Sequence, residues 1–194
     1  MNLPNKLTML RVILVPFFVL FMTLGDSPAF KLIALVIFVV ASLTDMLDGK
    51  IARKYNLVTN FGKLMDPLAD KVLVMSAMIC FVALEITPAW IVIVILAREF
   101  LVTSLRLIAA GEGTVIAADK WGKIKTVTQM VWIIWTILWL CVIGFGVFNG
   151  DADHSRVIWG YILSDLLMYA SVFFTLLSGF NYIYKNKQLL FTDM

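Results

Sequence analysis

The chain has 194 residues, of which 61% are hydrophobic, and a net charge of only +3. Its mean hydropathy is +0.94, whereas apolar residues make up roughly 45–50% of an ordinary soluble domain. The apolar residues run in long blocks along the whole sequence. This pattern excludes a separate soluble domain and predicts a single integral membrane domain over residues 1–194.

Six segments are apolar and long enough to cross a bilayer as helices, which takes about 20 residues each. They are residues 7–24, 29–54, 62–84, 88–109, 121–147 and 156–184. Gly, Pro, Asn and Asp residues of the kind found in turns separate them. We therefore expect an all-α fold of six transmembrane helices with short connections. The first segment lacks the small-residue cleavage site of a signal peptide, so we expect it to be retained.

The Lys and Arg residues fall mostly on one side of these predicted helices. Of the sixteen, only Lys31 and Arg156 fall on the other side, which leaves fourteen. Positive charge is typical of the cytoplasmic side of bacterial and eukaryotic membrane proteins. The sequence thus predicts a multi-pass protein of the cytoplasmic membrane, with both termini facing the cytoplasm.

Four aspartates occupy the facing ends of the second and third segments, at positions 45, 48, 66 and 70. Residues three or four apart share one face of a helix, so each helix presents a pair of carboxylates. The eight residues between Arg53 and Gly62 suffice for a turn that brings the helices side by side. We expect the four carboxylates to converge at the cytoplasmic face.

Four carboxylates near a bilayer repel one another and need compensating positive charge. Two divalent cations would balance them, and oxygen ligands favour Mg²⁺ or Mn²⁺ over zinc. The alternative is a set of structural ion pairs with nearby cations, namely Lys50, Arg53, Lys63 and Lys71. The number and spacing of the acids favour the metal site.

The segment from Asp45 to Asp70 carries eight characteristic residues: Asp45, Asp48, Gly49, Ala52, Arg53, Gly62, Asp66 and Asp70. With this spacing it resembles the complete signature of the CDP-alcohol phosphotransferases. The resemblance implies that family's six-helix membrane fold, a homodimer, and a CDP-linked substrate bound beside two divalent cations. It also implies roles for the matching positions. Asp45, Asp48, Asp66 and Asp70 would be metal ligands, Asp70 would also be the catalytic base, and Gly49, Ala52, Arg53 and Gly62 would border the CDP group.

Basic residues of the fourth segment and the start of the fifth predict an anionic acceptor, because Arg and Lys bind phosphate oxygens well. They are Arg98, Arg106, Lys123 and Lys125. Two alternatives remain open. Lys123 and Lys125 also suit an ordinary cytoplasmic loop, and Arg98 could pair with the aspartates or with Glu99.

Three segments, residues 2–11, 98–110 and 122–129, resemble the bacterial phosphatidylglycerophosphate synthases. This resemblance implies transfer of a phosphatidyl group from CDP-diacylglycerol to sn-glycerol 3-phosphate, with release of CMP, among surrounding membrane lipids. No nucleic-acid partner is expected. The nearest alternative is a synthase of the same family that uses inositol phosphate or serine. A divalent-cation transporter is an alternative of another class, although acids along an ion path should lie nearer the bilayer centre. We expect the last segment and His154 to add nothing to the assignment.

Overall fold

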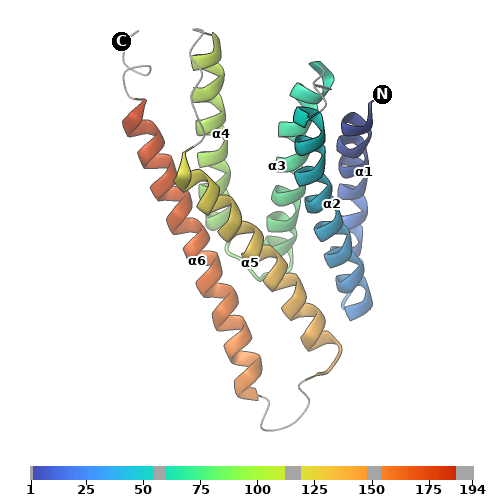
Figure 1. The fold of residues 1–194 in the computed structure, drawn as a ribbon. Helices are drawn as coiled ribbons and strands as arrows, with labels where there is room; N and C mark the ends of the chain where they lie inside the picture. Colours follow the sequence, from blue (N-terminus) through green and yellow to red (C-terminus); the bar gives the residue numbers. More distant parts are fainter. Residues whose placement is uncertain (1, 55–59, 112–118, 148–153, 187–194) are drawn as a thin grey trace. The chain divides into compact units, whose positions relative to one another are not determined.

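The computed structural model describes residues 2–54, 60–111, 119–147 and 154–186 (Figure 1). Within the helices, the side chains of residues 3, 4, 46–54, 60, 61, 63, 64, 66 and 67 are outside this description. Six helices make up the described part: α1 (Leu3–Thr23), α2 (Pro28–Lys54), α3 (Asn60–Ala83), α4 (Ala89–Gly111), α5 (Lys120–Gly144) and α6 (His154–Lys185). The described residues contain no strand, so the all-α prediction is confirmed for them.

Local chemistry sets the junction between α1 and α2. The backbone N–H of Leu24 donates to the Leu20 carbonyl to close the last turn of α1. Gly25 then adopts a φ of 137°, a conformation that only glycine adopts readily. Pro28 begins α2, where its missing N–H costs nothing.

Four helices of the described chain are long and apolar enough to cross a membrane. They are Asn5–Thr23, Pro28–Asp45, Lys120–Gly144 and His154–Lys185. The helices α3 and α4 differ because charged residues interrupt their apolar sequence: Asp66, Asp70 and Lys71 in α3, and Arg98, Glu99 and Arg106 in α4. These four helices support a multi-pass membrane protein.

Large apolar side chains cover the outer faces of the helices. Ile93 and Leu107 of α4 are 63% and 68% exposed, and Phe180 of α6 is 74% exposed. Apolar surface of this extent is unfavourable in water and typical of helices that face lipid. The exposed faces agree with a membrane location.

The chain divides into two compact units. The first comprises residues 1–87 and 133–161. In it, α1 packs along both α2 and α3, which contact each other much less among the residues that the structure describes. The buried rings of Phe18 and Phe38 lie 5.7 Å apart between α1 and α2. This packing makes α1 the element against which the two aspartate-bearing helices are aligned.

The second unit comprises residues 88–132 and 162–194. It contains α4, the first half of α5 and most of α6. Val102 and Leu105 of α4 pack with Tyr182 and Ile183 of α6. This contact brings residues of the fourth helix against a segment almost 80 positions later in the chain.

Candidate active site

The aspartates lie in the first unit, on α2 and α3. The side chain of Asp45 is 39% exposed, and Asp70 is also exposed, whereas Gly62 is buried. The side chains at five positions of the signature are outside this description, so their predicted roles stay predictions: Asp48, Gly49, Ala52, Arg53 and Asp66. Among the described residues no cluster of three or more metal-ligating side chains occurs, because two of the four predicted ligands are outside that set.

The carboxylates that are described fit a divalent cation in their chemistry. Asp45 and Asp70 offer hard oxygen ligands, as Mg²⁺ and Mn²⁺ prefer, and both remain accessible at the surface of the unit. A carboxylate sealed into the packing could not accept an incoming ion. The accessible carboxylates are therefore compatible with the predicted metal site.

A buried arginine forms an ion pair with Asp45. Arg11 of α1 is 0% exposed, and its Nη1 lies 2.5 Å from Oδ1 of Asp45. Asn5 and Thr8, which precede Arg11 at intervals of three, are also buried, so one polar stripe of α1 faces the interior. From the sequence, Arg11 counts as cytoplasmic positive charge and as part of the resembling segment 2–11, and no contact with Asp45 is predicted. The signal that could have indicated its buried position was the spacing of Asn5, Thr8 and Arg11, which lie three residues apart and so share one face of the helix.

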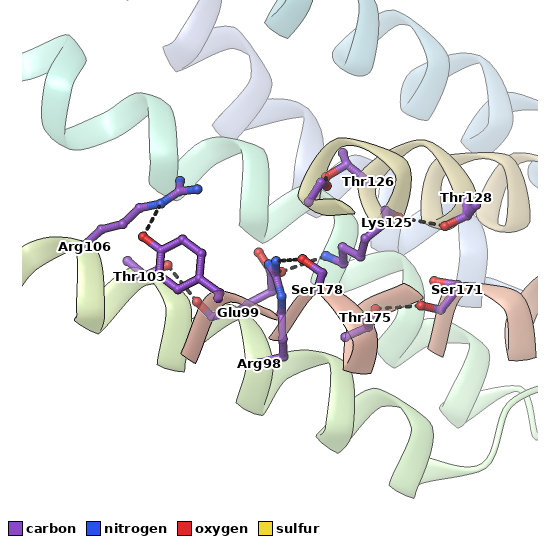
Figure 2. A network of polar contacts seen from close by, with 12 residues as sticks. Arg98, Glu99, Thr103, Arg106, Lys125, Thr126, Thr128, Ser171, Thr175 and Ser178 are labelled. Atoms are coloured by element: carbon purple, nitrogen blue, oxygen red, sulfur yellow. Dashed lines mark hydrogen bonds and ion pairs between the residues drawn. The ribbon is translucent and has the colours of Figure 1, made fainter. Parts of the chain in front are cut away.

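Glu99 is the centre of the basic cluster in the second unit. Its Oε1 accepts from Nη1 of Arg98 and from Nζ of Lys125, each at 2.8 Å. Figure 2 shows both cationic side chains converging on this carboxylate. The side chains of Lys125, Arg98 and Glu99 are 5%, 12% and 19% exposed. Pairing of Arg98 with Glu99, one of the alternatives left open, is confirmed, and Lys125 is a packed residue rather than a loop cation.

Arg106 has a different partner. Its Nε donates to the hydroxyl of Tyr182 at 3.2 Å (Figure 2), and its guanidinium carbon lies 5.5 Å from the centroid of the same ring. Such contact between a guanidinium and an aromatic ring is favourable. Tyr182 is only 3% exposed, so Arg106 lies against a firmly packed surface.

Lys123 is exposed near the start of α5 and is the least constrained of the four predicted acceptor residues. The start of α5 is held by Asp119. Its Oδ1 accepts from the backbone N–H of Lys120 at 2.9 Å, and its Oδ2 accepts from Asn181. Lys185 lies 3.4 Å from Oδ1. These contacts attach the start of α5 to α6.

The last helix contacts the basic residues of α4, although its sequence carries no motif that indicated this. Ser178 accepts from Nη2 of Arg98, and one turn later Tyr182 accepts from Arg106. The helices α4 and α6 run in the same direction here, so successive turns of α6 support successive arginines of α4. His154, at the start of α6, is exposed.

Small residues leave room for this network. A Cβ atom at Gly179 would lie 3.1 Å from Cγ of Arg98, and one at Gly122 would lie 3.7 Å from both Nη2 of Arg98 and Oγ of Ser178. The aliphatic part of Arg98 therefore packs against a bare backbone. Arg98, Lys125 and Arg106 carry three positive charges against one negative charge on Glu99, so the cluster retains an attraction for anions.

Comparisons with known proteins agree with the signature in the sequence. A family model described as CDP-alcohol phosphatidyltransferase matches residues 1–177. A relative from Bacillus subtilis, named CDP-diacylglycerol–glycerol-3-phosphate 3-phosphatidyltransferase, is 43% identical over 99% of this chain and 98% of its own. Relatives of the same name from Rickettsia typhi and Haemophilus influenzae are 39% and 36% identical, over 93% and 88% of this chain and 94% and 90% of their own. The resemblance drawn from the aspartate signature is confirmed, and the chain belongs to the CDP-alcohol phosphatidyltransferase family.

Proposed function

We propose that this protein transfers the phosphatidyl group of CDP-diacylglycerol to sn-glycerol 3-phosphate, giving phosphatidylglycerophosphate and CMP. The observation that carries the proposal is the complete Asp45–Asp70 signature in a chain 43% identical, over nearly its whole length, to a relative named for this reaction. The basic cluster around Glu99 supports an acceptor that carries a phosphate group. The protein is then an enzyme of phospholipid biosynthesis.

The aspartates would hold two divalent cations, Mg²⁺ or Mn²⁺, through Asp45, Asp48, Asp66 and Asp70. When bound, the cations would polarise the diphosphate and stabilise the charge on the departing CMP. Asp70, which is exposed on α3, would accept the proton from the primary hydroxyl of glycerol 3-phosphate. That hydroxyl oxygen bonds to the lipid-linked phosphorus while the bond from this phosphorus to CMP breaks.

Gly49, Ala52, Arg53 and Gly62 would border the CDP group, since small residues allow a ligand to approach the backbone closely. Gly62 is buried where α3 begins. Arg98, Arg106, Lys123 and Lys125 would bind the acceptor phosphate. Three of them are ordered by contacts with Glu99 or Tyr182, which limits the conformational entropy lost when the acceptor binds.

All six helices would span the cytoplasmic membrane as one domain, with the site and both termini facing the cytoplasm, and the chain would form a homodimer among membrane lipids. The helices α3 and α4 have 24 and 23 residues, so at 1.5 Å per residue each is roughly 35 Å long, enough for a bilayer core of about 30 Å. Charged residues inside spanning helices normally face the interior and pair. Arg98 and Glu99 of α4 do both.

The test is CMP release from CDP-diacylglycerol by the purified protein with Mg²⁺, with glycerol 3-phosphate, inositol phosphate, serine or no acceptor. We expect release only with glycerol 3-phosphate, and none after chelation of the metal. Release with a different acceptor would preserve the aspartate roles and overturn the choice of head group. Failure of every acceptor would overturn the enzymatic proposal.

A further inference from the structure

Glu99 brings two cations to a single oxygen atom. Nη1 of Arg98 and Nζ of Lys125 both lie 2.8 Å from its Oε1. The two donors come from α4 and α5, and neither is adjacent to the other in sequence. The position of each cation relative to the other is therefore set by one carboxylate (Figure 2).

Two like charges that contact the same oxygen atom are close together, and they repel strongly in a poorly solvated interior. The side chains of Arg98 and Lys125 are at most 12% exposed, so water screens them weakly. Without an anion between them, the side chains would gain energy by separating. The carboxylate of Glu99 keeps them together before any substrate arrives.

The opposite side of Arg98 is restrained by α6. Nη2 of Arg98 donates to Ser178, and the absence of a side chain at Gly179 admits its aliphatic stem. Arg98 is thus held by α6 on one side and by Glu99 on the other.

We propose that Glu99 is a positioning residue of the acceptor site, which holds Arg98 and Lys125 as a pair of cations ready to bind the phosphate group of the acceptor. The inference rests on the proposed function. Glu99 acts through the two cations and does not touch the phosphate, because a carboxylate and a phosphate repel each other. With Arg106 included, the cluster has a net charge of about +2, and a phosphate monoester carries about −1.5 to −2 at pH 7.

The experiment compares Glu99→Gln with wild type in the CMP-release assay, varying each substrate in turn. Glutamine preserves the shape of the side chain but removes the charge that opposes the two cations. We expect the KM for glycerol 3-phosphate to rise by roughly tenfold or more, since small misplacements of binding groups cost this much. The KM for CDP-diacylglycerol should stay within about twofold. Glu85→Gln, the same change in an exposed turn, is the matched control and should leave both constants unchanged.

Glu99→Asp provides a second test if the glutamine variant does not fold. It preserves the charge balance and withdraws the carboxylate by one methylene, so we expect a smaller rise confined to the same KM. An unchanged or lower KM for glycerol 3-phosphate in the folded variant would overturn the inference, and a lower one would mean that Glu99 competes with the phosphate. An equal rise in both KM values would also overturn it, by indicating a general structural role. If wild type itself shows no release that depends on glycerol 3-phosphate, the proposed function fails, and this inference with it.

Discussion

The guanidinium of Arg11 is completely buried in α1 and lies 2.5 Å from the carboxylate of Asp45 on α2. Asp45 still has 39% of its side chain exposed. The arginine thus approaches the carboxylate from the protein interior and leaves its other side accessible. Groups that orient a metal ligand from behind have this arrangement, although the partner here is a cation whose charge also offsets the aspartates.

Arg11→Met should release Asp45 from this orientation. Loss of such a supporting contact typically costs about 10- to 100-fold in metal affinity or activity. We expect losses in this range in both Mn²⁺ affinity, measured by calorimetry, and CMP release. In Arg11→Lys, metal affinity and CMP release should lie between those of wild type and Arg11→Met, because lysine preserves the charge but lacks the planar fork of arginine. Arg156→Met, at an exposed position of α6, is the control. Wild-type metal affinity in Arg11→Met would show that Arg11 serves only to stabilise the fold.

Asp70→Asn should lower turnover by about 10²- to 10⁴-fold, the usual contribution of a general base. Binding of CDP-diacylglycerol should change much less, because a base acts mainly in the transition state. Single-turnover kinetics and direct lipid binding separate the two effects. Asp165→Asn changes an exposed acid of α6 and should have no effect on either. Turnover at the wild-type rate in Asp70→Asn would exclude Asp70 as the base.

Arg106→Ala should raise the KM for glycerol 3-phosphate far more than that for CDP-diacylglycerol. Tyr182→Phe removes the hydroxyl that accepts from Nε of Arg106 but preserves the ring beneath its guanidinium. The donor is a charged guanidinium, and a hydrogen bond with a charged group contributes about 1.5–3 kcal/mol, so we expect the same KM to rise roughly 10- to 100-fold in this variant. Both constants come from the CMP-release assay. A rise confined to the KM for CDP-diacylglycerol would indicate that Arg106 binds this substrate and not the acceptor.

Gly160→Ala should destabilise the first unit. A Cβ atom there would lie 1.8 Å from Cε2 of Trp139, and the carbonyl of Gly160 accepts from Trp135, so α6 has little freedom to move away. Excess volume in a packed interior costs about 1–3 kcal/mol. The midpoint of thermal unfolding in detergent should fall. Gly111→Ala adds its methyl group to open space and should not lower it. Recovery of stability in Gly160→Ala with Trp139→Leu would identify the clash as the cause, while an unchanged midpoint in Gly160→Ala would disprove the close contact.

The helices themselves were predictable from the sequence. Every predicted helix agrees with an observed one to within four residues at either end. The reason is that long apolar blocks, and the Gly and Pro residues between them, act locally. The all-α class and the signature of Asp45 to Asp70 follow from the same kind of local pattern, and the family comparison confirms what the signature implied.

The partners of the charged residues depended on tertiary structure. Sequence alone placed Arg98, Arg106 and Lys125 in one basic group, but it left open whether Arg98 pairs with an acid and whether Lys125 is an ordinary loop cation. Ser178 and Tyr182, which support the two arginines, lie 80 and 76 residues further along the chain. Arg11 similarly finds Asp45 on another helix. Hydrophobic periodicity determines which segments become helices, but it does not specify which helix faces pack against each other. That choice is made by packing between side chains distant in sequence, and it alone decided which charges are paired.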